Sequence, residues 1–317
     1  MPQLEVGSPE WTARRRQGIG GSDIAKILRV SRFGGPMDCF MEKSGLTAPL
    51  IETSAMRWGK LLEGPVAEEY ALKTGRKIRR GADFLTHPAY EWAFANIDRW
   101  SLKRGTPKRV LEVKTTSPFG AKEFGEPGSD QVPADYLLQV MWYLTVTGVE
   151  VADLAVLIGG QKHEVYTIER DPVLIESMID QAHTFWSNLK AGIPPEIDGS
   201  EGSSAYLAHV YRDQGTERPM DDQLARFALQ YASLKAIEKD NKAQQDLVGN
   251  WIRDLMGNAR WAEGEGVRVL YSEVKGRRTV DWPALVAARN IPQAVVEEFT
   301  RVGDPTRSLT VTPKGDI

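Results

Sequence analysis

The stretch VLEVKTTS, residues 110–117, decides the fold of this chain. Successive side chains of a β-strand point to opposite faces, so Glu112 and Lys114 lie on one face and Val113 on the other. The polar turn KRGTPK joins this predicted strand to a second one over 90–101. An acid and a base on one face form either a surface ion pair or half of a metal-dependent active site.

A second carboxylate is predicted close to this strand. The segment FANIDRW places Asp98 on the preceding strand, and a hairpin brings it near Glu112. Two carboxylates repel one another unless a cation lies between them. The carbonyl of Val113 offers a third oxygen, and hard oxygen ligands suit Mg²⁺ or Mn²⁺. Lys114 then lies where it can orient or deprotonate a water beside the metal, which is the chemistry of phosphodiester cleavage.

Two helices add further polar groups. Glu63 lies on an amphipathic helix predicted over 57–74, which either supplies another carboxylate to the metal site or exposes a charge to solvent. Gln139 lies on the helix after the hairpin, between Tyr136 and Tyr143 at helical spacing. The apolar side of that helix can cover the sheet while Gln139 faces the acidic cluster. The alternative is an ordinary amphipathic helix.

Composition limits the class of protein. The length of 317 residues favours two domains, and the single cysteine, Cys39, excludes a disulfide framework and a cysteine metal cage. The N-terminus lacks the apolar core of a signal peptide, and no run approaches the about 18 apolar residues of a membrane span. These features favour a reducing cytoplasm and no membrane partner.

The net charge of −3 does not by itself suggest a nucleic-acid partner. Basic residues are nevertheless clustered at 14–16 and at 76–80. Each cluster is either solvated surface charge or part of a surface that binds an anionic partner. The distribution of charge therefore carries more information than its sum.

Turn residues divide the chain into further elements. Helices are predicted over 20–28, with Ser22 or Asp23 as the N-cap, and over 37–45, closed by Gly45. The elements that follow the acidic hairpin are a helix over 133–148, a hairpin over 151–170 turning at Gly159 and Gly160, and a helix over 171–190.

The stretch AGIPPEIDGSEGSS, residues 191–204, is the best candidate for a domain boundary because it is rich in Gly, Ser and Pro. We therefore expect a core over 1–198 and a mainly helical extension with a small β part over 199–317. The elements predicted in the extension are a long helix over 220–256, a strand over 267–274, a helix over 282–289 and a final strand SLTVT, with Trp251 and Trp261 in its core.

Four segments of the chain carry a resemblance to a known family. In order they are WTARRRQGIGGSDIAKIL, WGKLLEGPVAEEY, NIDRW followed by LEVKTTS, and PADYLLQVMWYL. Together they resemble the YqaJ-like viral recombinase nucleases, whose best-known relative is phage lambda exonuclease, in the PD-(D/E)xK superfamily. The likeness covers residues 11–145 and weakens towards 190. It implies an α/β (α+β) fold, with a restriction-endonuclease-like core whose central mixed sheet is flanked by helices.

The resemblance also implies roles for single residues. Asp98 and Glu112 correspond to metal ligands, together with the carbonyl of Val113, and Lys114 corresponds to the catalytic lysine. Glu63 resembles the helix glutamate of the site.

A second set matches the region that, in relatives, binds the 5′-phosphate of a DNA end. It consists of Trp11, Arg15 and Ser22, with Gln139 in the same region. An arginine forks onto phosphate oxygens, and a serine at a helix N-terminus offers its hydroxyl and free N–H groups. Alternatively, Ser22 only caps its helix. Asn96 stands where lambda exonuclease has a serine, and its amide can still donate a hydrogen bond to the phosphate.

The activity that the resemblance implies is a Mg²⁺-dependent 5′-to-3′ exonuclease acting on double-stranded DNA ends, with Mn²⁺ able to substitute and two ions possible. It would leave 3′ overhangs for a single-strand annealing partner. Relatives form a ring-shaped homotrimer, in which arginine clusters can line the channel while the outer surface stays acidic. The implied setting is the cytoplasm of a bacterial host, with a phage or prophage gene.

Two other functions remain open. The chain could be an endonuclease or an iron–sulfur exonuclease of the same superfamily, although one cysteine cannot hold a cluster that needs four. It could also be a non-catalytic module that binds DNA ends. Digestion of linear and closed circular DNA separates the endonuclease, and substitution of Lys114 separates the non-catalytic module.

Overall fold

The protein is described by a computed structural model that covers residues 7–47, 52–82, 84–212, 215, 217–302 and 309–312. The chain divides into two compact units, Met1–Tyr211 and Arg212–Ile317. We call the first the core unit and the second the C-terminal unit, and each is described by itself.

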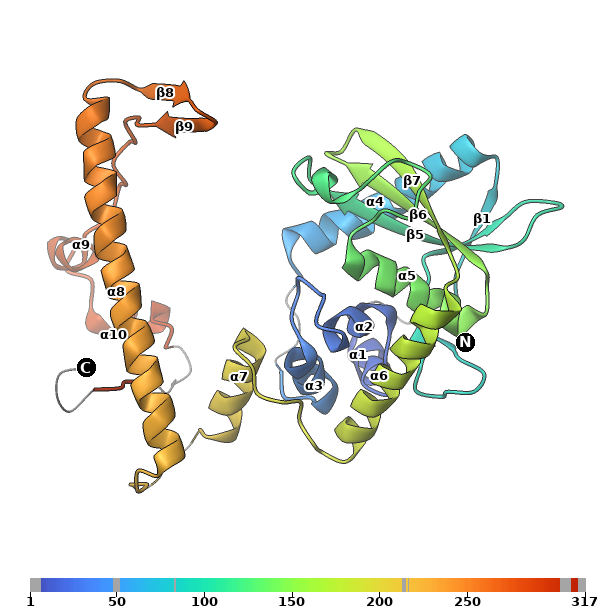
Figure 1. Cartoon of the computed structure of the whole chain (residues 1–317), viewed down its shortest axis with the longest axis horizontal. Helices are drawn as coiled ribbons and strands as arrows, with labels where there is room; N and C mark the ends of the chain where they lie inside the picture. The colour runs from blue at the N-terminus through green and yellow to red at the C-terminus, as the bar shows by residue number, and fades with distance from the viewer. Residues whose placement is uncertain are drawn as a thin grey trace. The chain divides into compact units, whose positions relative to one another are not determined.

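A mixed five-stranded sheet forms the centre of the core unit (Figure 1). All neighbouring strands are antiparallel except β5 and β6, which are parallel and therefore need a crossover, supplied by helix α5. The expected mixed α/β fold class is confirmed. In sheet order the strands are β1 (Lys77–Arg80), β4 (Arg99–Leu102), β5 (Arg109–Thr116), β6 (Val151–Ile158) and β7 (Lys162–Glu169).

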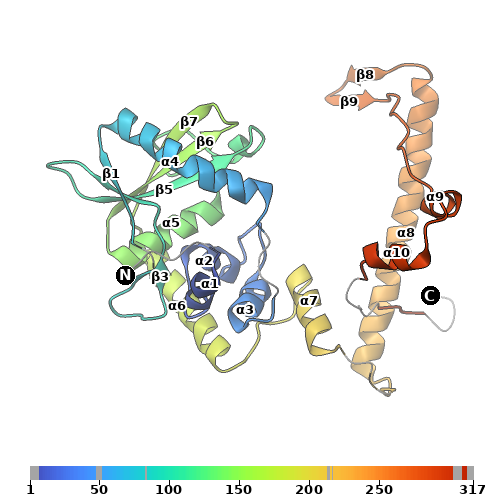
Figure 2. The same cartoon turned by 180° about the vertical axis from the view of Figure 1, so that it is seen from behind.

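Helices cover both faces of the sheet, as Figures 1 and 2 show. Helix α4 packs on one face, where its Val66 and Tyr70 meet Leu111 and Val113 of β5. The opposite face, which carries Val110, packs against α5 and the helices behind it. The helices of the core unit are α1 (Pro9–Arg15), α2 (Gly21–Ile27), α3 (Pro36–Ser44), α4 (Ser54–Thr74), α5 (Ala134–Thr147), α6 (Pro172–Lys190) and α7 (Glu201–Val210), with a 3₁₀ turn at Gly120–Glu123.

Glycines end three of these helices, and Gly45 does so as the sequence predicts. Gly45, Gly75 and Gly148 follow α3, α4 and α5 in the left-handed conformation, which glycine adopts without a Cβ clash. Gly159 and Gly160 also have positive φ angles and form the turn between β6 and β7.

The strand predicted over 90–101 is wrong in its first half. Strand β3 (Phe94–Ala95) pairs with β2 (Leu85–Thr86) in a separate two-stranded sheet, and β4 begins only at Arg99. The reason is a long-range contact: Ile19 donates to the carbonyl of Trp92 and accepts from the N–H of Phe94. This part of the chain therefore pairs with the N-terminal segment instead of continuing the hairpin.

The predicted N-cap of α2 is also wrong. Gly20 is the N-cap residue, and the carboxylate of Asp23, three positions later, accepts the Gly20 N–H at 2.8 Å. Ser22 lies in the first turn and is exposed. Its hydroxyl is thus available to another side chain, which turns out to be Arg15.

The division between the units falls after Tyr211, later than the composition suggests. Ser200, within the Gly/Ser-rich stretch, caps α7 by accepting the N–H of Ser203. Tyr206 of α7 then packs edge-on against Phe40 of α3, with ring centroids 6.0 Å apart. Helix α7 therefore belongs to the core unit.

The C-terminal unit contains α8 (Asp222–Met256), the hairpin β8 (Trp261–Gly264) and β9 (Val267–Leu270), α9 (Trp282–Ala288) and α10 (Gln293–Phe299). Trp251 and Trp261 are 57% and 61% exposed, so their predicted burial is wrong. The hairpin and the short helices are too small to cover a 35-residue helix. Of the predicted final strand, 309–312 are not in a strand, and Ser308 lies outside the described residues.

Within the described ranges, none of the helices is both long and apolar enough to cross a membrane.

Candidate active site

The acidic hairpin is formed by β4 and β5. Arg99 pairs with Leu111 in the antiparallel register, so Asp98, one residue before β4, lies level with Glu112. The carboxylate of Asp98 accepts the backbone N–H of Val113 at 2.8 Å. Since the N–H and C=O of one residue point to the same edge of a strand, the carbonyl of Val113 faces the Asp98 side as well.

Glu112 is buried and has one oxygen engaged and one oxygen without a partner. Its Oε1 accepts from Lys114 Nζ at 2.7 Å and from Gln139 Nε2 at 2.8 Å. Its Oε2 is buried and has no hydrogen-bond partner among the described residues. A buried, unpartnered carboxylate oxygen is costly unless a ligand satisfies it.

The charges around Asp98 repel one another. Burial raises the pKa of Asp98, and the nearby carboxylates of Glu112 and Glu63 raise this pKa further. Burial alone would lower the pKa of Lys114, but Glu112 and Asp98 outweigh it and the pKa is raised. The site thus favours positive charge, because Lys114 and Arg99 together do not neutralise the carboxylates of Asp98, Glu112 and Glu63.

Glu63 reaches the site from α4, on the opposite side of the hairpin from Gln139. Its Oε1 accepts from Arg99 Nη1 at 2.6 Å, and the same nitrogen donates to the carbonyl of Asp98 at 2.7 Å. Glu63 is therefore close enough to influence Asp98 but is already paired with a cation.

The donor set fits a hard divalent cation. Within the described residues no group of three or more His, Cys, Asp or Glu side chains is assembled for a metal ion. Asp98, the unpartnered Oε2 of Glu112 and the Val113 carbonyl nevertheless offer oxygen donors at one edge of β5, which suits Mg²⁺ or Mn²⁺.

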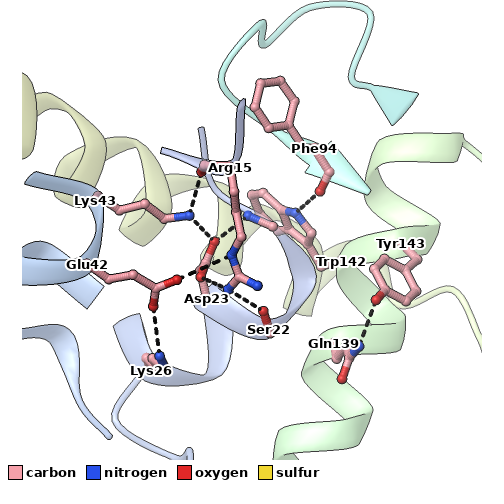
Figure 3. Close-up of polar contacts among 11 residues, drawn as sticks. Arg15, Ser22, Asp23, Lys26, Glu42, Lys43, Phe94, Gln139, Trp142 and Tyr143 are labelled. Carbon is pink, nitrogen blue, oxygen red and sulfur yellow. Dashed lines mark hydrogen bonds and ion pairs between the residues drawn. The ribbon is translucent and has the colours of Figure 1, made fainter. Parts of the chain in front are cut away.

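Arg15 forms a second polar group, at the junction of α1, α2 and α3 (Figure 3). Its Nη2 donates to Ser22 Oγ and to Asp23 Oδ1, both at 2.9 Å. Its Nε lies 3.3 Å from Glu42 Oε1, and its guanidinium carbon lies 5.2 Å from the ring centre of Trp11. The structure thus brings together Trp11, Arg15 and Ser22, the three residues that the family resemblance groups.

A close helix contact connects this group with the acidic cluster. A Cβ atom on Gly21 would lie 2.6 Å from a ring carbon of Tyr143 and 3.1 Å from Cγ of Gln139. Only glycine lets α2 approach α5 this closely. Gln139 also donates to the Tyr143 hydroxyl at 2.7 Å, so its amide links Tyr143 to Glu112.

Asn96 is engaged in local structure. Its side-chain oxygen accepts the backbone N–H of Phe84, whose φ of 50° is unusual for an aromatic residue. Phe84 in turn contacts Trp11, with ring centroids 6.3 Å apart. Asn96 therefore supports the loop beside Trp11.

Three residues of these groups were not expected from the sequence: Arg99, Glu42 and Lys43. Lys43 is buried although it is a lysine, and Arg99 follows directly on Asp98. A lysine on the helix pattern of 37–45 gives no signal of burial, because the pattern does not show which helix packs against it.

Comparison with known proteins places the chain among relatives. The family model of the YqaJ-like viral recombinase domain matches residues 10–150. The chain is 34% identical over 318 residues to an uncharacterised protein, YqaJ, of Bacillus subtilis (strain 168), spanning 96% of this chain and 92% of that protein.

Solved structures are similar over a little more than half of the chain. An alkaline exonuclease from Laribacter hongkongensis, LHK-Exo, crystallised in complex with dAMP, is 20% identical, with a TM-score of 0.47, over 58% of this chain and 94% of that one. A phage-related exonuclease from Haemophilus somnus 129PT is 12% identical, with a TM-score of 0.42, over 57% of this chain and 98% of that one.

Proposed function

This chain belongs to the YqaJ-like viral recombinase family, and from that premise we propose that it is a metal-dependent nuclease acting on double-stranded DNA ends. It removes one strand in the 5′-to-3′ direction and leaves a 3′ overhang for recombination by single-strand annealing. The observation that carries this proposal is the arrangement of Asp98, Glu112 and Lys114 on one hairpin.

The bound cation is proposed to be Mg²⁺, held by Asp98, Glu112 and the Val113 carbonyl, with Glu63 beside them. When bound, the metal would stabilise negative charge on the scissile phosphate and lower the pKa of a bound water. Mn²⁺ is expected to substitute for Mg²⁺.

The protein groups have separate tasks. Lys114 donates to Glu112 through its ammonium group, so its remaining protons can orient a water or a phosphate oxygen. Gln139 donates to the same Glu112 oxygen, which leaves Oε2 without a partner among the described residues. Tyr143, buried behind Gln139, fixes the amide in this orientation.

Arg15 and Ser22 are proposed to bind the 5′-phosphate of the DNA end. A guanidinium and a hydroxyl are suitable donors for phosphate oxygens. Trp11 stacks near Arg15, and Asn96 supports the neighbouring loop. The contact at Gly21 keeps Arg15 and Ser22 beside Gln139, so a DNA end held by Arg15 directs its adjoining strand towards the acidic hairpin.

The family resemblance further suggests a homotrimer that encircles duplex DNA and a separate single-strand annealing protein as partner. Encirclement would concentrate the basic residues at 14–16 and 77–80 around the DNA while the net charge of the chain stays at −3. Arg76 of the second cluster is buried and donates to Ser101 and to the carbonyl of Pro107, so it has a structural role.

The test uses linear duplexes labelled at either end, with and without a 5′-phosphate, and a covalently closed circle, in Mg²⁺ and in EDTA. We expect release from the 5′-phosphorylated end in Mg²⁺ only, and a circle that survives. Cleavage of the circle would establish the alternative, an endonuclease of the same superfamily.

Lys114→Ala is expected to reduce cleavage at least about a hundredfold, because it removes a group placed at the reacting phosphate. DNA binding in EDTA should persist. Lys162→Ala is a matched control, since the Lys162 side chain is 67% exposed and forms its ion pair with Glu164 on β7. Unchanged cleavage by the Lys114 variant would favour a non-catalytic module that binds DNA ends.

A further inference from the structure

Five charged side chains alternate in sign around Arg15 (Figure 3). Arg15 contacts Asp23 on one side and Glu42 on the other. Asp23 contacts Lys43 at 2.6 Å, and Glu42 contacts Lys26 at 3.1 Å. Following the ion pairs from one side chain to the next, the charged series runs Lys43, Asp23, Arg15, Glu42, Lys26.

The five side chains of this charged series are not equally buried. The side chains of Asp23 and Lys43 are both fully buried, whereas those of Arg15 and Glu42 are 24% and 33% exposed. A lysine is almost never fully buried unless it is paired. The Lys43 end of the series is therefore closed to solvent, and Arg15 and Glu42 are its most exposed members.

The balance of charge leaves one positive charge. Three members are cations and two are carboxylates, and the neutral pair Asp23–Lys43 lies inside. Without Lys43 the two carboxylates would balance Arg15 and Lys26, and no charge would remain. Burial alone would raise the pKa of Asp23, but Lys43 and then Arg15 outweigh it and hold this pKa well below its usual range.

Lys43 also fixes where Arg15 lies. Its Nζ donates to the main-chain carbonyl of Arg15 at 2.9 Å, at the last residue of α1. A cation at a helix C-terminus is favourable. One buried ammonium group thus contacts both the backbone that carries Arg15 and the carboxylate that holds its guanidinium.

We propose that Lys43 is a positioning residue for an anionic DNA end: by neutralising Asp23 it keeps the charge of Arg15 available to a terminal phosphate, and Lys26 does the same at Glu42. This inference rests on the proposed function, specifically on the contact between Arg15 and the 5′-phosphate. Lys43 and Lys26 would thus contribute to the selection of the DNA end by acting through Asp23 and Glu42.

The experiment measures binding in EDTA, by fluorescence anisotropy, of a short duplex with a 5′-phosphate and the same duplex with a 5′-hydroxyl. The readout is the ratio of the two affinities, which a uniform loss of folded protein does not change. Lys43→Met is expected to lower this ratio about tenfold, the scale of one charge-assisted hydrogen bond. Lys162→Gln is the control on a surface lysine.

Two further variants keep the test valid where Lys43→Met does not fold. Lys26→Gln should lower the ratio by about two- to threefold, because Glu42 is partly screened by solvent. Glu42→Gln should raise the ratio, since it removes a carboxylate beside Arg15. A purely structural role of the cluster predicts no such opposite signs.

Arg15→Ala separates the inference from its premise. If Arg15→Ala abolishes the preference for phosphate while the Lys43, Lys26 and Glu42 variants keep the wild-type ratio, the inference is overturned and the phosphate site stands. If Arg15→Ala itself leaves the ratio unchanged, the phosphate site is overturned together with the inference.

Discussion

Asp23 and Asp98 are two enclosed carboxylates of the core unit whose surroundings move their pKa values in opposite directions. Asp23 accepts from Lys43, Arg15 and the Gly20 N–H. Asp98 accepts the Val113 N–H, and burial with the carboxylates of Glu112 and Glu63 raises its pKa more than Lys114 lowers it.

The two carboxylates therefore have different roles: Asp23 stabilises the fold, and Asp98 belongs to the candidate active site. The protein itself satisfies Asp23, so its charge stabilises the junction of three helices. Asp98 is left with a charge that its neighbours oppose, which is the condition under which an external cation binds most favourably. Strongly perturbed carboxylates of the second kind are the better indicators of a functional site.

The largest effect on stability is expected at Asp23. Asp23→Asn leaves Lys43 buried without its counter-ion, and we expect a loss of about 3 kcal/mol in the free energy of unfolding. Urea unfolding measures this loss, with the exposed Asp180→Asn as the control, expected within about 0.5 kcal/mol of the wild type. A variant at position 23 as stable as the wild type would remove the basis of the comparison.

The same variant has a defined pH dependence. The pKa of Asp23 in the folded state is below its ordinary value of 3.8. Its stabilising contribution is therefore complete above pH 3.8 and is lost as the pH falls through the lower, folded-state value. Asp23→Asn should reduce the dependence of stability on pH in that acidic range and not near neutrality.

Asp98 should respond in the opposite direction. In EDTA, Asp98→Asn is expected to raise the free energy of unfolding by about 1–2 kcal/mol, because it removes a poorly compensated enclosed charge. Addition of Mn²⁺ should then stabilise the wild type and leave the variant unchanged. Thermal melts with and without Mn²⁺ test both statements, and destabilisation of the variant in EDTA would contradict the first.

The smallest effect concerns Glu63. Arg99→Gln releases Glu63 from a partly exposed ion pair worth about 1 kcal/mol, so we expect Mn²⁺ to bind about fivefold more tightly. Calorimetric titration with Mn²⁺ measures the change, and Arg79→Gln, on the exposed strand β1, serves as control. Weaker binding in the Arg99 variant would show that the guanidinium supports the site instead of competing for Glu63.

The sequence predicts those parts of the site that depend on the alternation of side chains along a strand or on their spacing along a helix. Alternation along β5 puts Glu112 and Lys114 on one face, where their side chains meet. The hairpin puts Asp98 against the same strand, and helical spacing puts Gln139 on the side of α5 that reaches Glu112. The likeness to the YqaJ-like family is confirmed by the relative that spans nearly the whole chain.

The parts that it does not predict depend on residues far apart in the chain. The division of 90–101 into two strands follows from its pairing with Ile19, and the burial of Lys43 follows from the packing of α3 against α1 and α2. The pairing of Glu63 with Arg99 requires α4 to lie over the hairpin. Local patterns carry no information on such partners, so their roles emerge only in three dimensions.

The absence of a side chain at Gly21 has a consequence for the reaction product. At this residue α2 lies against α5 with no room even for a methyl group. On the proposed roles, it sets how far a terminal phosphate at Arg15 lies from the bond that is cut at Glu112. The distance between the backbones of α2 and α5 would therefore determine how many nucleotides are released in each turnover.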